Sequence, residues 1–66
     1  MKLKITQNVD VDIEKTRINE IWPKYLQRND ILRVDKIESV SKDTVNLVLD
    51  DGDTLLNVPN TVYSVL

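Results

Sequence analysis

Apolar and polar side chains alternate along the first part of the chain. The apolar residues of this part fall at odd positions: Leu3, Ile5, Val9, Val11 and Ile13. A period of two over this length is typical of a strand with one buried face, so extended structure is predicted here. Because strands average about 5–6 residues, we expect a bend near Gln7-Asn8.

The spacing of the apolar residues changes after residue 13. They now recur at helical intervals: Ile18, Ile21, Trp22 and Tyr25. This spacing predicts a helix, or short helical turns, within residues 14–27. Asp12 is the expected N-cap, and Pro23 is expected to end or interrupt the helix near Trp22. An irregular excursion fits the same residues almost as well.

The second half of the chain returns to extended patterns. Residues 31–40 alternate, but the parity of their apolar residues slips near Asp35-Lys36, which predicts a β-bulge. Residues 44–49 give the clearest strand pattern, with the odd-numbered residues expected to be buried. A return strand is predicted at residues 54–58, and a last short strand at residues 62–66.

Turn residues separate these segments. Asn29-Asp30 and Pro59-Asn60-Thr61 are typical turn sequences, and Ser41-Lys42-Asp43 forms a short connection. Asp50-Asp51-Gly52-Asp53 lies between two apolar segments, which is a strong signal for a tight β-hairpin.

The order of these elements resembles the SH3-like barrel. In that fold a long loop, a tight hairpin and a single turn occupy the places of residues 8–29, 50–53 and 59–61. The segment Val58-Pro59-Asn60-Thr61-Val62-Tyr63 also resembles the hydrophobic-Pro-Ser-Asn-Tyr-Val ending of signalling SH3 domains. The resemblance implies one mainly β domain over residues 1–66, a five-stranded small barrel with a short helix or helical turns in the long loop.

Some motifs of signalling SH3 domains are missing from the chain. It lacks Ala-Leu-Tyr-Asp-Tyr, and Leu47 stands in the strand where those domains have paired tryptophans. Val62 and Tyr63 stand in reversed order, so we expect Tyr63 to face away from the ligand-binding side. Recognition of proline-rich peptides is therefore not expected from the resemblance.

Composition supports β structure and removes several kinds of chemistry. The chain has nine Val, eight Leu and six Ile but no Ala or Phe, and β-branched residues favour strands. The absence of Cys and His excludes disulfides and cysteine catalysis, disfavours a zinc site and removes the usual general base. A single Gly leaves no phosphate-binding loop. We expect no enzyme activity, no cofactor and no metal.

No membrane or export signal is visible in the chain. No segment approaches the roughly 18 apolar residues that span a bilayer. Residues 1–6 are too short and too polar for a signal peptide. We therefore expect a cytoplasmic protein with no membrane partner.

Charge is distributed unevenly. The net charge is −2, but residues 1–36 hold eight basic and six acidic side chains, whereas residues 37–66 hold one basic and five acidic ones. One alternative function is a nucleic-acid-binding barrel that uses four basic residues: Lys2, Lys4, Arg33 and Lys36. The net negative charge and the presence of only three aromatic residues disfavour nucleic acid as the partner.

Two groups of acidic residues have candidate chemistry. Asp50-Asp51-Gly52-Asp53 offers oxygen ligands to a hard cation, but it lacks the alternating pattern and the terminal Glu of a calcium loop. Asp10 and Asp12, with Glu14, have the groups for general acid and base catalysis, which also requires a cleft that raises one pKa. In both places we expect solvated acids, on a hairpin tip and on a strand face.

The aromatic residues are the best candidates for binding, because Trp and Tyr are enriched at interfaces. We predict a protein-binding surface from four residues: Trp22, Tyr25, Pro59 and Tyr63. In the alternative, Trp22 plugs the mouth of the barrel together with Ile18 and Ile21, because the chain has no Phe to fill its core.

The function expected from the sequence is a non-enzymatic protein-interaction module whose partner is unknown. By analogy with other small proteins of this kind, we expect the protein to come from a phage or a mobile element. The alternatives are nucleic-acid binding and a structural subunit of a homo-oligomer, since a domain of about 60 residues buries only about 60% of its unfolded surface.

Overall fold

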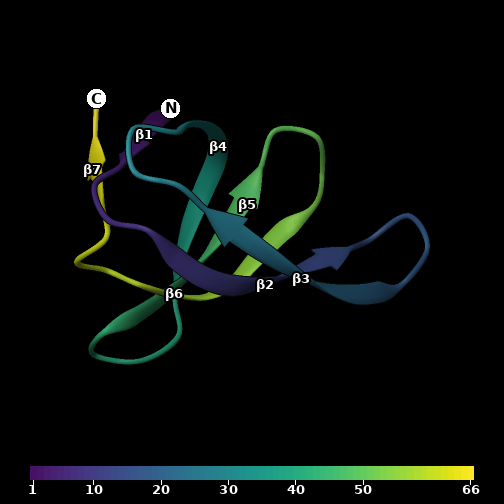
Figure 1. Cartoon of the computed structure of the whole chain (residues 1–66). Coiled ribbons are helices and arrows are strands. Elements are labelled where there is room, and N and C mark those ends of the chain that lie inside the picture. The colour runs from purple at the N-terminus through teal and green to yellow at the C-terminus, as the bar shows by residue number, and fades with distance from the viewer.

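The chain folds into β-strands joined by turns, without any helix. A computed structural model describes residues 1–66, and Figure 1 shows the strands in chain order. The strands are β1 (Lys2–Ile5), β2 (Val9–Lys15), β3 (Glu20–Leu26), β4 (Ile31–Ser39), β5 (Thr44–Leu49), β6 (Thr54–Pro59) and β7 (Tyr63–Val65). They pair antiparallel in the order β3-β2-β6-β5-β4-β1-β7. The mainly β class predicted from the sequence is confirmed.

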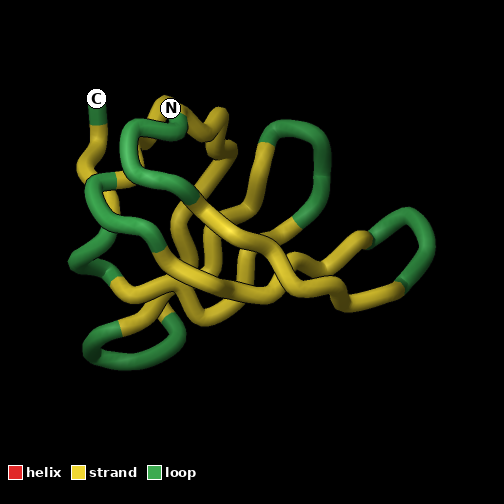
Figure 2. The backbone as a smooth tube through the Cα atoms, in the orientation of Figure 1, coloured by secondary structure: helices red, strands yellow, loops and turns green.

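The expected five-stranded barrel with helical turns is wrong in two respects. The structure has seven strands, and the segments between them are loops and turns (Figure 2). β3 and β7 form the two edges of the sheet and no pairing joins them, so the sheet is not closed. The structure contains no helix that could cross a membrane.

β1 and β2 are the two halves of the first alternating segment. β1 ends at Ile5 and β2 begins at Val9, which confirms the predicted bend near Gln7-Asn8. Ile5 is fully buried and Ile13 is 9% exposed, as the alternation predicts. After the bend the chain changes neighbours: β1 pairs with β4 and β7, whereas β2 pairs with β3 and β6.

The segment predicted as helical is instead the second strand of a long hairpin. β3 pairs with β2 from Lys15↔Glu20 to Val9↔Leu26, so the excursion is regular. The intervening turn contains Asn19 at a φ of 54°, a conformation that asparagine tolerates better than most residues. Pro23 disfavours a helix because it has no backbone N–H to donate. An edge strand such as β3 accepts proline, because the backbone N–H groups on its open side have no partner strand.

β4 links the two ends of the sheet. Residues 31–33 pair with β1, and from Val34 onward the strand pairs with β5. The register shifts between Val34 and Lys36, which confirms the predicted bulge near Asp35-Lys36. A bulge bends its strand and increases the local twist, and Figure 1 shows that the sheet is strongly curved.

The core lies inside this curve. It consists of eleven buried aliphatic side chains from β1 to β6 and from the turn before β7. Leu47 of β5 is fully buried, and Leu55 of β6 is 1% exposed. The hairpin between these strands is confirmed, with Gly52 at a φ of 95° in its turn. The Pro-led turn is also present, since the Val62 amide donates to the Pro59 carbonyl over 3.3 Å.

Candidate functional site

Strand β3 is the most exposed strand of the molecule, and it belongs to a hairpin that extends beyond the rest of the sheet (Figure 1). Six of its seven residues are exposed, and only Leu26 is buried. Three of the exposed side chains are large and apolar: Ile21 is 59% exposed, and Trp22 and Tyr25 are each 47% exposed. Ile18, in the turn of the hairpin, is 52% exposed.

The register of the hairpin assigns these side chains to two faces. Trp22 lies opposite Ile13, whose side chain is buried, so Trp22 is on the face turned toward the core. The other face, here called the outer hairpin face, carries three cross-strand pairs: Asp10 with Tyr25, Asp12 with Pro23, and Glu14 with Ile21. Trp22 and Tyr25 are three residues apart, so in a strand they fall on opposite faces.

Trp22 lies on the core-facing side of the hairpin but is not buried in the core. Its indole Nε1 donates a hydrogen bond to Glu20 Oε1 over 3.1 Å. Lys15 Nζ lies 5.7 Å from the centre of the ring, within the range of a cation–π contact. The alternative that Trp22 plugs a barrel mouth with Ile18 and Ile21 is wrong, since all three are about half exposed or more.

The other two predicted binding residues lie away from the hairpin strands. Pro59 ends β6, opposite Thr44 of β5. Tyr63 belongs to β7, opposite Ile5, and is half-buried against the core. The structure therefore places Trp22 and Tyr25 on one exposed hairpin, and it places Pro59 and Tyr63 on other strands.

Of the four basic residues predicted to bind nucleic acid, three lie together and one lies apart. Lys2 and Arg33 are direct neighbours across β1 and β4, and Lys4 lies two residues along on the same face. Lys36 lies beyond the bulge, and its Nζ is 3.7 Å from Glu38 Oε2. Lys2, Lys4 and Arg33 form no ion pair, so only these three offer unpaired positive charge together.

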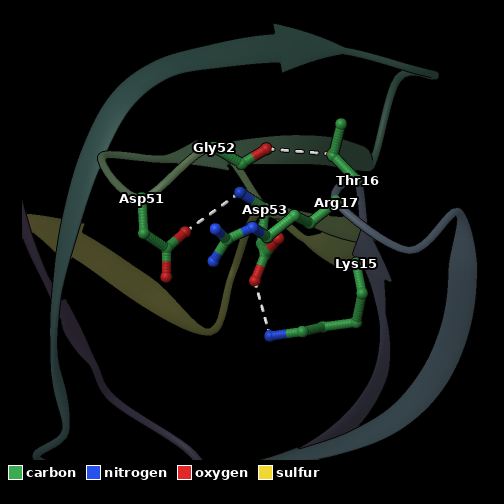
Figure 3. Close-up of a pocket in the computed structure, with 6 residues that line it drawn as sticks. All are labelled: Lys15, Thr16, Arg17, Asp51, Gly52 and Asp53. Carbon is green, nitrogen blue, oxygen red and sulfur yellow. Dashed lines mark hydrogen bonds and ion pairs between the residues drawn. The ribbon is translucent and has the colours of Figure 1, made fainter.

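A polar pocket of about 490 Å³ lies between the turn after β2 and the turn between β5 and β6 (Figure 3). Lys15 Nζ donates to Asp53 Oδ2 over 2.6 Å, and Thr16 Oγ1 donates to the Gly52 carbonyl over 3.0 Å. Asp51 Oδ1 accepts the Asp53 amide over 2.9 Å. The first two bonds join the two turns, and the third lies within the turn between β5 and β6.

Lys15 is held in its charged form. The hydrogen bond to Asp53 raises the pKa of Lys15 above its usual 10.5, burial lowers it in part, and the charges of Asp53 and Asp51 raise it further. A lysine that stays protonated is neither a base nor a nucleophile at neutral pH. The pocket therefore offers structural support to the hairpin and no catalytic group from this residue.

The Lys15–Asp53 pair is a feature that sequence reasoning missed. Its partners are 38 residues apart, and no local pattern links them. Asp53 was expected among solvated acids at a hairpin tip, but it is 8% exposed. A second, smaller hollow of about 360 Å³ lies beside Arg33 and Asp50, and no hydrogen bond between side chains crosses it.

Comparisons of the chain with protein-family models, with curated proteins and with solved structures find no match.

Proposed function

We propose that the protein is a non-enzymatic protein-interaction module that binds its partner through the β2–β3 hairpin. The observation that carries this proposal is the exposure of Ile21, Trp22 and Tyr25 on one edge strand. Burying apolar surface is worth roughly 25 cal/mol per Å², so a partner that covers these side chains gains binding energy. Trp and Tyr are also the residues that most often dominate interface energetics.

The order of connections supports an SH3-like relationship for this module. The long connection after β1 is a hairpin, a tight turn follows β5, and a Pro-led turn precedes β7. The open seven-stranded sheet and the inward packing of Tyr63 depart from signalling SH3 domains. We therefore propose a binding surface on the hairpin and not in a groove for proline-rich peptides.

The proposal is tested by capture from cell lysate with two matched variants. The hairpin variant carries Trp22→Ala and Tyr25→Ala. The control carries Val40→Ser, which removes an apolar side chain that is 49% exposed in the loop between β4 and β5. We expect wild type and control to retain a protein that the hairpin variant loses. Equal capture by all three, with circular dichroism showing folded variants, contradicts the proposal.

A second proposal, nucleic-acid binding, has one observation in its favour. Lys2, Lys4 and Arg33 lie together on one face without acidic partners. The net charge of −2 weakens it, because a polyanion is repelled by the rest of the surface. A gel shift at low salt tests it, and the absence of any shift under that condition removes nucleic acid as a partner.

A further inference from the structure

The exposed apolar side chains concentrate at the two free edges of the sheet. Nine large apolar residues are exposed, and Val40 is the only one outside these edges. Those near the β3 edge are Ile18, Ile21, Trp22 and Tyr25. Those near the β7 edge are Met1, Ile31, Val65 and Leu66. Exposed apolar side chains therefore lie near both open strands, and near each strand they are divided between the two faces of the sheet.

The outer faces of the sheet near these two open strands form two surfaces of opposite charge. The outer hairpin face has a row of three acids on β2: Asp10, Asp12 and Glu14. The outer face of β1 and of the first residues of β4 has a basic group: Lys2, Lys4 and Arg33. None of these six side chains belongs to an ion pair within the chain. Each surface thus lacks the charge that the other one supplies.

The spacing of the charges also matches. Lys2 and Lys4 are two residues apart on one strand, as are Asp10 and Asp12 on another. Side chains two residues apart in a strand are about 6.4–6.8 Å apart, so the two rows can meet charge to charge. Each row has an apolar flank, with Tyr25 opposite Asp10 and Ile31 opposite Lys4.

We propose that a second copy of this chain occupies the outer hairpin face, and that it docks through its Lys2, Lys4 and Arg33 surface. This inference rests on the proposed function, because it names a partner for the same hairpin. A second copy fits because one chain supplies both complementary surfaces. A nucleic acid fits only the basic surface, and the acidic row on the same molecule opposes its approach.

The two surfaces lie on different strands of a sheet that curves around its core, so they face in different directions. Each copy therefore joins one neighbour through β2 and β3 and another through β1 and β4. Contacts of this kind are head-to-tail, and they build a ring or an open chain of copies. A standard interface of about 800 Å² per partner is a substantial part of a surface of 4479 Å².

Sedimentation equilibrium over a range from micromolar to millimolar protein tests the inference. Salt screens charges with a Debye length of about 30 Å at 0.01 M and about 3 Å at 1 M. At low salt we expect the average mass to rise with concentration to at least twice the 7.6 kDa of one chain. At high salt we expect the mass to return toward that of one chain.

Charge reversal separates docking from a general loss of solubility. One variant carries Asp10→Lys and Asp12→Lys, and the other carries Lys2→Glu and Lys4→Glu. Each variant alone repels its own copies and is expected to stay monomeric, whereas an equal mixture of the two associates again. Lys42→Glu, in the loop between β4 and β5, is the control, and its association is expected to match wild type within about twofold.

Two results overturn the inference. One is a wild-type chain that remains monomeric at millimolar concentration and low salt. The other is a pair of folded charge-reversal variants that associate as wild type does. Neither result decides the capture experiment, because that experiment uses the Trp22 and Tyr25 variant and measures which protein is retained from lysate. If self-association fails while the hairpin variant still loses its captured protein, the hairpin binds another protein and not a second copy.

Discussion

Strands β5 and β3 are similar in length but differ in what surrounds them. β5 pairs with β4 on one side and β6 on the other, and none of its six residues is exposed. β3 pairs with β2 alone, and six of its seven residues are exposed. Apolar residues are therefore part of the core in β5 and, apart from Leu26, part of the surface in β3.

The difference shows how this small chain divides its apolar residues. Leu47 and Leu55 meet inside the curve of the sheet, where burial contributes to the stability of the fold. Ile21 and Tyr25 lie on the outer hairpin face, where they contribute little to folding and are free to contact a partner. The central strands hold the fold together, and the edge hairpin offers the surface.

The largest effect is expected from truncation in β5. Leu47→Ala removes a fully buried side chain and leaves a cavity, so the free energy of unfolding should fall by about 2–5 kcal/mol. Urea denaturation followed by circular dichroism measures the change. Ile21→Ala is the matched truncation in β3, and its effect should stay within about 0.5 kcal/mol. Equal losses from the two truncations would break the distinction between the strands.

The next largest loss of stability is expected from a substitution in the turn that connects β5 to β6. Gly52 has a φ of 95°, and a Cβ added there meets no atom within 4 Å. Gly52→Val should therefore cost about 1–2 kcal/mol through backbone strain alone. Thermal melts measure it, with Gly52→Asn as a control, because asparagine tolerates positive φ. A Gly52→Val variant as stable as wild type contradicts this account of the turn.

A smaller loss of stability is expected for Trp22, whose exposed fraction lies between those of Leu47 and Ile21. Trp22→Ala removes the contact with Lys15 and part of the cover over Ile13. An exposed cation–π contact is worth about 0.5–1 kcal/mol, so we expect a loss of about 1 kcal/mol in urea denaturation. A loss as large as that of Leu47→Ala would show that Trp22 belongs to the core.

The smallest effect depends on pH and tests the link between the hairpin and the β5–β6 turn. The pKa of Lys15 is raised in the folded state by its hydrogen bond to Asp53. The corresponding stabilisation is complete below the usual lysine pKa of 10.5, and it is lost as the pH rises through the higher folded value. Wild type should therefore melt higher than Asp53→Asn at pH 8, and the gap should narrow above about pH 10.5. A gap that is constant across this range contradicts the assignment.

The sequence predicted the central strands well because each has one buried face. Alternation predicted β1, β2 and β5, and the slip in parity near Asp35 predicted the bulge in β4. In β3 no face is fully buried, so the pattern of alternation is lost. The remaining spacing of Ile18, Ile21, Trp22 and Tyr25 also fits a helix, and that prediction was wrong.

The candidate surface could be predicted only in part. The sequence singled out Trp22 and Tyr25 as binding candidates, but the choice of helix or strand decides which side chains share a face. The pairing of Asp10 with Tyr25 depends on the register of the hairpin. The ion pair that joins Lys15 to Asp53 spans two turns that only the folded sheet brings together.

Pro23 affects whether other chains can add to the open edge of β3. A free strand with apolar side chains is a template on which other chains can add by backbone pairing, and such growth leads to fibrils. Proline has no amide hydrogen, so an incoming strand finds a missing donor in the middle of β3. The hairpin can thus present an exposed apolar surface to a folded partner and still resist the cross-β stacking that leads to fibrils.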